Sequence, residues 1–177
     1  MTRSRSITFL ASLAVLTLAG LTLAACGGGS SSSGSSAPPT TADGRPATIG
    51  VSNESLGKVL VDSQGRTLYL FQKDSGTMSA CTGECASDWP PLRANGKPTE
   101  GSGANASLVG TATRADGKPQ VTYNGHPLYL YQGDHKPGDM KGQGVNAFGA
   151  SWYVLSPAGN QITSPVANSG GGGGYGY

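Results

Sequence analysis

Two short segments of the chain alternate strictly between leucines and aromatic rings. They are L-Y-L-F-Q-K-D, from Leu68 to Asp74, and L-Y-L-Y-Q-G-D, from Leu128 to Asp134. Successive side chains of a β-strand point to opposite faces, so the leucines of each segment lie on one face and the rings on the other. Because both faces are apolar, we expect each segment to form a central strand that is covered on both sides.

A turn signal precedes each segment. Asn124-Gly125 separates residues 120–123 from residues 126–131, and Asn-Gly between two β-prone runs is the strongest short hairpin signal. The first copy has its corresponding turn at residues 62–65. The sequence therefore predicts a β-hairpin in each copy.

Weaker patterns predict the remaining elements. Residues 108–114 are expected to form a further strand, and residues 48–52 an edge strand. Long helices are not expected, because the chain shows no extended apolar pattern with a 3.6-residue period. Residues 81–88 form at most one or two helical turns before Pro90 stops them.

The two copies form a repeat, with Tyr69 and Tyr129 lying 60 residues apart. Each copy continues through a loop to a return segment that contains Trp89 or Trp152. A lone hairpin cannot bury its apolar faces. We therefore predict a mostly β fold, in which two duplicated β-hairpin repeat units pack into one small antiparallel sandwich or barrel-like domain.

Composition sets the expected boundaries. Glycine, serine and proline dominate the stretch before the domain, and the chain ends in G-G-G-G-G-Y-G-Y. Such segments are typical of flexible tethers and disordered tails. Tyr175 and Tyr177 are candidate contacts for a wall polymer or another protein. The expected regions are a signal peptide at 1–25, a tether at 26–47, a β-rich domain at 48–157 (repeat one 55–92, repeat two 106–157) and a disordered tail at 158–177.

The first 26 residues resemble a bacterial lipoprotein signal peptide. Arg3 and Arg5 precede an uncharged run from Ile7 to Leu23, and two alanines then lead to Cys26. A Gly/Ser tract follows instead of a charged stop, which favours cleavage over a membrane-spanning helix. We expect lipidation at Cys26 and a chain anchored to the outside of the cell membrane, the alternative being an ordinary secretory signal with a coincidental cysteine.

Charge excludes one class of partner. The chain has twelve basic and ten acidic residues; without Arg3 and Arg5, the mature chain has ten of each. No basic stripe remains to bind nucleic acid. The expected partners are the membrane, through the lipid on Cys26, and an envelope protein or cell-wall component. We expect a monomer.

Several motifs resemble those of the bacterial secreted-repeat lipoproteins, a family marked by Y-x-[FWY]-x-x-D. The motif residues here are Tyr69, Phe71, Asp74, Tyr129, Tyr131 and Asp134. The family segment C-x-x-x-C-x-x-x-W-P-P is also present, as Cys81, Cys85, Trp89, Pro90 and Pro91. The resemblance covers about residues 55 to 157. It implies an exported lipoprotein of unassigned activity, with no catalytic residue and no cofactor to carry over.

Cys81 and Cys85 are the only cysteines besides Cys26. Outside the cytoplasm such a pair normally oxidises, and residues four apart on a helical turn are close enough for a disulfide. One interpretation is a staple that braces the loop before Trp89. The other is a redox or metal-binding dithiol which, with Met78 nearby, would hold a soft ion such as Cu(I).

Other side chains carry weaker hypotheses. His126, His135 and Met140 form a candidate copper site, although the two histidines lack a metal-ligand spacing motif. Asp74 and Asp134 are expected to accept backbone N–H bonds in their own turns; a hydrolase acid pair is the alternative. The aromatic residues are expected to be core, with a ligand groove as the alternative.

The leading functional hypothesis is a non-catalytic lipoprotein module that binds or scaffolds at the cell envelope. The main alternative is a redox or copper-handling lipoprotein that uses Cys81 and Cys85. A hydrolase that uses Asp74 or Asp134 is a weaker one.

Overall fold

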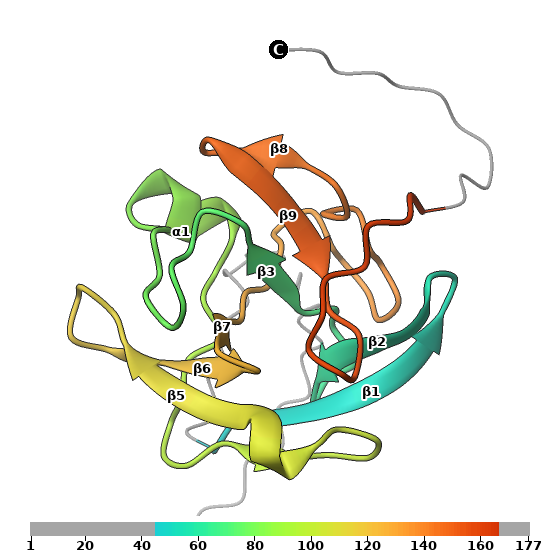
Figure 1. Cartoon of the computed structure of the whole chain (residues 1–177), viewed down its shortest axis with the longest axis horizontal. Coiled ribbons are helices and arrows are strands. Elements are labelled where there is room, and N and C mark those ends of the chain that lie inside the picture. The colour runs from blue at the N-terminus through green and yellow to red at the C-terminus, as the bar shows by residue number, and fades with distance from the viewer. Residues whose placement is uncertain (1–44, 167–177) are drawn as a thin grey trace, which may run out of the picture. The chain divides into compact units, whose positions relative to one another are not determined.

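The computed structural model describes residues 45–166 (Figure 1). The proposed signal peptide, the lipidation site Cys26, and Tyr175 and Tyr177 of the tail lie outside these residues. Within residues 45–166, none of the helices has the length and apolarity needed to cross a membrane.

The described part of the chain is mostly β, as predicted. Its strands form three small sheets, with the orders β2-β1-β4, β3-β9-β8 and β5-β6-β7. All pairings are antiparallel except β1 with β4, which is parallel. The elements are β1 (Thr48–Glu54), β2 (Gly57–Asp62), β3 (Tyr69–Phe71), α1 (Glu84–Asp88), β4 (Thr99–Glu100), the 3-10 turn η1 (Ala106–Leu108), β5 (Val109–Thr113), β6 (Pro119–Tyr123), β7 (His126–Pro127), β8 (Asn146–Ala147) and β9 (Ala150–Val154).

The second predicted hairpin is present. Asn124 and Gly125 have φ of 49° and 79°, the left-handed values that a tight hairpin turn requires. The turn joins β6 to β7, and the Leu128 N–H continues the pairing by donating to the Val121 carbonyl at 3.0 Å. The expected strand at 108–114 is β5, and the expected short helix is α1.

Two strand predictions need correction. Residues 48–52 were expected at an edge, but β1 lies in the middle of its sheet, between β2 and β4. The first hairpin is paired only near its turn, where Val61 bridges Thr67 and the Leu68 N–H donates to Leu60. Beyond Leu68 the chain leaves β2, and β3 pairs with β9 instead.

The two repeats exchange their return segments. β9, the return of repeat two, lies beside β3 of repeat one (Figure 1). The two strands pair in a register that places Phe71 opposite Trp152. The return of repeat one pairs with the central segment of repeat two, because the Leu92 N–H donates to the Leu128 carbonyl at 2.8 Å. The central segment of each repeat therefore pairs with the return segment of the other repeat.

At the centre, the two central segments pair directly with each other. The Tyr69 N–H donates to the Tyr129 carbonyl at 2.9 Å, and the Tyr129 N–H donates back at 3.0 Å. These are the equivalent residues of the two repeats. The expectation that both hairpin units share one interior is thus confirmed.

The leucine and ring faces of the central segments enter different cores. Leu68, Leu70, Leu128 and Leu130 belong to one cluster of buried side chains. The rings of the same segments belong to a second cluster, with both tryptophans and both cysteines of the domain. Strict alternation in the sequence is therefore explained by a strand layer with a core on each side.

Packing continues after Pro157. Gln161 bridges Leu155, and the Ile162 N–H donates to the Val154 carbonyl at 2.9 Å. Val166 packs against the aromatic core. The C-terminal segment 158–166 thus forms part of the packed domain.

Candidate functional site

The motif tyrosines and aspartates form two crossed pairs. The Tyr69 hydroxyl donates to Asp134 Oδ2 at 2.6 Å, and the Tyr129 hydroxyl donates to Asp74 Oδ2 at 2.8 Å. Each tyrosine therefore binds the aspartate of the other repeat. The pairs connect the repeats by side chains at the place where Tyr69 and Tyr129 already connect them by backbone.

The second carboxylate oxygen of each aspartate binds its own repeat. Asp74 Oδ1 accepts the Ala80 N–H at 2.8 Å, and Asp134 Oδ1 accepts the Lys141 N–H at 2.9 Å. Backbone acceptance was predicted from the sequence, although the donors lie six and seven residues further along rather than in the turn itself. The crossed tyrosine bonds were not predicted.

Burial changes the acidity of both pairs. It raises the pKa of the Asp134 carboxyl to about 6, against the opposing bonds from Tyr69 and Lys141. Burial also raises the pKa of Asp74, but Arg114 lies close enough to oppose the increase. The pKa of each tyrosine is raised, first by burial and next by its aspartate. The hydroxyls therefore remain protonated donors at neutral pH.

A column of parallel rings fills the aromatic core. Phe71 stacks on Trp152 at 4.0 Å, Trp152 on Trp89 at 3.9 Å, and Trp89 on Tyr131 at 4.2 Å between ring centroids. The four rings come alternately from repeat one and repeat two. Tyr69 meets Trp89 edge-on, and Tyr129 meets Trp152 in the same way. The prediction that the rings are core is confirmed for the five buried rings of this set, whereas Tyr131 is half-buried.

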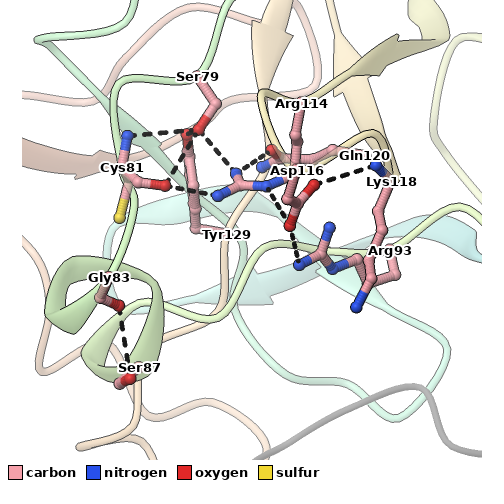
Figure 2. Close-up of polar contacts among 10 residues, drawn as sticks. All are labelled: Ser79, Cys81, Gly83, Ser87, Arg93, Arg114, Asp116, Lys118, Gln120 and Tyr129. Carbon is pink, nitrogen blue, oxygen red and sulfur yellow. Dashed lines mark hydrogen bonds and ion pairs between the residues drawn. The ribbon is translucent and has the colours of Figure 1, made fainter.

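The loop that follows Asp74 is fastened by charge and by a covalent bond. Figure 2 shows Arg114 reaching into this loop, where its guanidinium donates to the Ser79 hydroxyl at 2.7 Å and to the Cys81 carbonyl. The same guanidinium binds Gln120 Oε1 at 2.6 Å. Ser79 in turn lies 2.7 Å from the Tyr129 hydroxyl.

The cysteine pair closes this loop. Cys81 and Cys85 form a disulfide with a Cα–Cα distance of 5.2 Å, and both residues are buried. The bond braces α1 just before Trp89, whose N–H donates to the Cys85 carbonyl at 2.8 Å. This arrangement is the staple expected from the sequence.

The loop that follows Asp134 is held differently. Thr67 donates its hydroxyl to the Asp139 carbonyl at 2.7 Å, and the Asp139 carboxylate accepts the His135 N–H at 3.0 Å. Gly142 lies against the rings, since a Cβ there would be 2.7 Å from Trp89 and 3.0 Å from Tyr69. Only glycine allows so close an approach without displacing the column.

A surface cavity of about 660 Å³ opens beside this second loop. Gln143 fixes its walls: the side-chain amide donates to the carbonyls of Ile162 at 2.6 Å and Ser164 at 3.0 Å, and its oxygen accepts the Val154 N–H at 2.9 Å. The lining residues are Ser55, Gly138, Asp139, Met140, Lys141, Gln143, Gly144, Tyr153, Thr163, Ser164, Pro165 and Val166.

Comparison with known families agrees with this duplicated geometry. A family model described as a secreted repeat of unknown function matches the chain twice, over residues 50–93 and 110–156. The chain belongs to this family. Neither a curated protein nor a solved structure matches. Membership in a family of secreted repeats places the chain outside the cytoplasm.

In this secreted-repeat protein, the residues of the repeat motif join the two repeats to each other. Each matched region contributes one tyrosine and one aspartate to the crossed pairs. Each also contributes two rings to the aromatic column. In this chain, the crossed pairs and the ring column each require residues from both repeats.

The copper candidates lie in separate surroundings in this secreted-repeat domain. Met140 is buried in the aromatic core, whereas His135 is exposed on the second loop. His126 lines a smaller cavity of about 350 Å³ together with Asp74. Among residues 45–166, no group of three or more histidine, cysteine, aspartate or glutamate side chains is arranged to hold a metal ion.

Sequence reasoning named only two of the side chains that line the larger cavity, Met140 as a copper candidate and Tyr153 as one of the aromatic residues of a possible groove. The lining residues Ser55, Lys141 and Thr163 belong to no repeated motif and were missed. The sequence did offer one signal for this loop, because Gly138, Gly142 and Gly144 follow Asp134 closely. In the structure, two of these glycines have positive φ. Such spacing indicates a loop with demanding backbone geometry, although it does not indicate a cavity.

Proposed function

We propose that this protein is a lipid-anchored, non-catalytic module that binds a component of the cell envelope through the cavity beside the second loop. The anchor is the lipid on Cys26, and the stretch at 26–47 is the tether. Two acyl chains give stable attachment, since each buried methylene contributes about 0.8 kcal/mol.

The observation that carries the non-catalytic part is the crossed pairing. Both oxygens of Asp74 and both oxygens of Asp134 already accept hydrogen bonds from the protein itself. A general acid or base must lie within hydrogen-bond reach of its substrate, and each of these oxygens already accepts a bond from the protein. The motif aspartates are instead committed to joining the repeats and shaping the two loops.

The cavity supports the binding part. Its volume of about 660 Å³ is in the range of ligand sites, roughly 300–1,000 Å³. Its wall is held by Gln143 and by the bond between Lys141 and Asp134. The duplicated core thus holds an open surface that presents both polar and apolar side chains.

The anchor is tested with the full-length chain and a Cys26→Ser variant expressed in a bacterium. We expect the wild-type chain in the membrane fraction with a lipid mass by intact mass spectrometry, and the variant in the soluble extracytoplasmic fraction. Ser33→Ala, in the tether, is the matched control and stays in the membrane. Membrane attachment of Cys26→Ser would contradict the anchor.

Binding is tested by sedimentation of the mature chain with isolated cell-envelope material. We expect co-sedimentation that falls when Thr163→Val or Tyr153→Phe removes one hydroxyl from the cavity. Thr111→Val removes an exposed hydroxyl from β5, away from the cavity lining, and leaves co-sedimentation unchanged. Equal binding by all four proteins would exclude the cavity as the binding face.

A further inference from the structure

We propose that the cavity beside the second loop binds a neutral, polyhydroxylated chain, that is, an uncharged glycan. This inference rests on the proposed binding function and names its ligand class. It is drawn from the unused hydrogen-bonding groups, the balanced charge and the exposed apolar surface of the cavity.

The first observation is a set of free hydroxyls. The side chains of Ser55, Tyr153, Thr163 and Ser164 line the cavity, and none of them hydrogen-bonds another residue within the described part of the chain. A hydroxyl both donates and accepts. A row of such groups matches a ligand whose own groups are mostly hydroxyls, because either partner can act as the donor.

The second observation is charge. The charged groups that line the cavity are Lys141 and Asp139, whose Nζ and Oδ2 lie 3.6 Å apart. The His135 N–H bond lowers the pKa of Asp139, so this carboxylate is ionised at neutral pH. One positive and one negative group leave no net charge to attract a polyanion or a polycation. An uncharged ligand fits this balance.

The third observation is the apolar surface between the polar groups. The Tyr153 ring is half-buried, and Pro165 and Val166 lie on the C-terminal wall. Sugar rings present C–H groups on one face and hydroxyls at their edges. An aromatic ring with nearby hydroxyls offers both kinds of contact, since a tyrosine combines an apolar body with a polar tip.

Hydrogen bonds also hold the wall of the cavity in place. Gln143 joins the second loop, β9 and the C-terminal segment through three hydrogen bonds. Thr67 fixes the same loop at the Asp139 carbonyl. A pre-formed site loses less entropy when it binds a weakly held ligand.

The experiment is calorimetric titration of the full mature chain, purified in detergent, with four tetrasaccharides. Chitotetraose and cellotetraose are the neutral probes, tetragalacturonate is the acidic probe, and the fully deacetylated chitosan tetramer is the cationic probe. We expect a neutral probe to bind more tightly than either charged one. Thr163→Val and Tyr153→Phe should each weaken that binding about 2- to 10-fold, the value of one hydrogen bond.

Two measurements separate the possible failures. Thr111→Val serves as the control, and thermal unfolding of each variant verifies that the fold is retained. Suppose that co-sedimentation of the envelope material still depends on the cavity. If a charged probe then binds best, or if no neutral probe binds, the glycan inference is wrong and the binding function stands. If neither the envelope material nor any probe depends on Thr163 and Tyr153, both are wrong.

Discussion

The two loops that follow the motif aspartates begin alike and end differently. Each starts with a carboxylate that binds the tyrosine of the other repeat and a backbone N–H of its own loop. The first loop is then closed by the Cys81–Cys85 disulfide and penetrated by Arg114. The second has neither and instead lines a cavity. Duplication therefore preserves the centre, while the two loops differ in structure.

The same contrast appears in the electrostatics. Arg114 opposes the rise in the pKa of Asp74, whereas Asp139 adds to the rise at Asp134, whose pKa is about 6. Burial nevertheless leaves the pKa of Asp74 raised, and the bonds from Ala80 and Tyr129 oppose the rise before Arg114 does. Burial is also the main cause of the rise at Asp134, where the charge of Asp139 adds to it and the charge of Lys141 opposes it. We infer that the first loop serves stability and the second serves binding.

The largest expected effect is a loss of stability, and it should be the same for the corresponding tryptophan of either repeat. Trp89 and Trp152 stack at the centre of the ring column, and both are fully buried. Replacing either by alanine should lower the free energy of unfolding by about 3–5 kcal/mol, as measured by urea denaturation. A large effect for only one of the two would show that the repeats do not share one column.

The next largest effect is a difference in stability between variants of the two motif tyrosines. Tyr69→Phe leaves Asp134 Oδ2 without its hydroxyl partner, and a buried group left unpaired costs about 1–3 kcal/mol. Tyr129→Phe should cost less, because Arg114 remains near Asp74 and compensates its charge. Urea denaturation of both variants measures the difference. Equal losses would mean that Arg114 does not distinguish the sites.

The disulfide affects only the first loop. Closing so short a segment stabilises by about 2 kcal/mol on the chain-entropy estimate. Cys81→Ala with Cys85→Ala should therefore lower stability by about that amount while leaving binding at the cavity unchanged. Chemical denaturation and the envelope sedimentation assay measure the two halves of this prediction. A loss of binding in a folded double variant would contradict the independence of the loops.

The sequence specifies the strand faces better than the strand partners. The alternation at Leu68–Phe71 assigns each side chain to a face, and Asn124-Gly125 defines a turn, because both are local effects. The exchange of return segments is not local: Trp89 and Trp152 both follow their own repeats at similar spacing, and the pattern suits pairing within a repeat equally well. The central position of β1 depends on Thr99–Glu100, a polar pair with no strand signal.

The candidate site was harder to predict than the core. Asp74 and Asp134 were recognised because they repeat, and their backbone bonds follow from the ordinary behaviour of aspartate near turns. Their tyrosine partners lie 55 and 65 residues away and become neighbours only when the repeats interlock. The cavity residues come from four separate parts of the chain and carry no shared pattern. Only the tertiary arrangement brings Ser55, Lys141 and Thr163 to one surface.

The smallest effect is a pH dependence that distinguishes the two carboxyls. The folded-state pKa of Asp134, about 6, lies above the ordinary aspartate pKa of about 3.9. Between these values the folded state holds a proton that the unfolded state releases. Stability should therefore fall as pH rises from about 4 to 6 and level off above 6. Asp134→Asn should flatten this slope, whereas Asp74→Asn should flatten it less, because Arg114 opposes the rise in the pKa of Asp74.

Thermal unfolding between pH 4 and pH 7 measures these slopes. Asp116→Asn serves as the control, because the pKa of this exposed residue is lowered to about 2 by Arg93 and its effect lies outside the range measured. If Asp134→Asn leaves the pH dependence of stability unchanged, the extra proton of the folded state is bound by a group other than Asp134. A slope that both motif variants flatten equally would show that the two crossed pairs, despite Arg114, have the same electrostatic surroundings. The distinction between a stabilising loop and a binding loop would then rest on the disulfide alone.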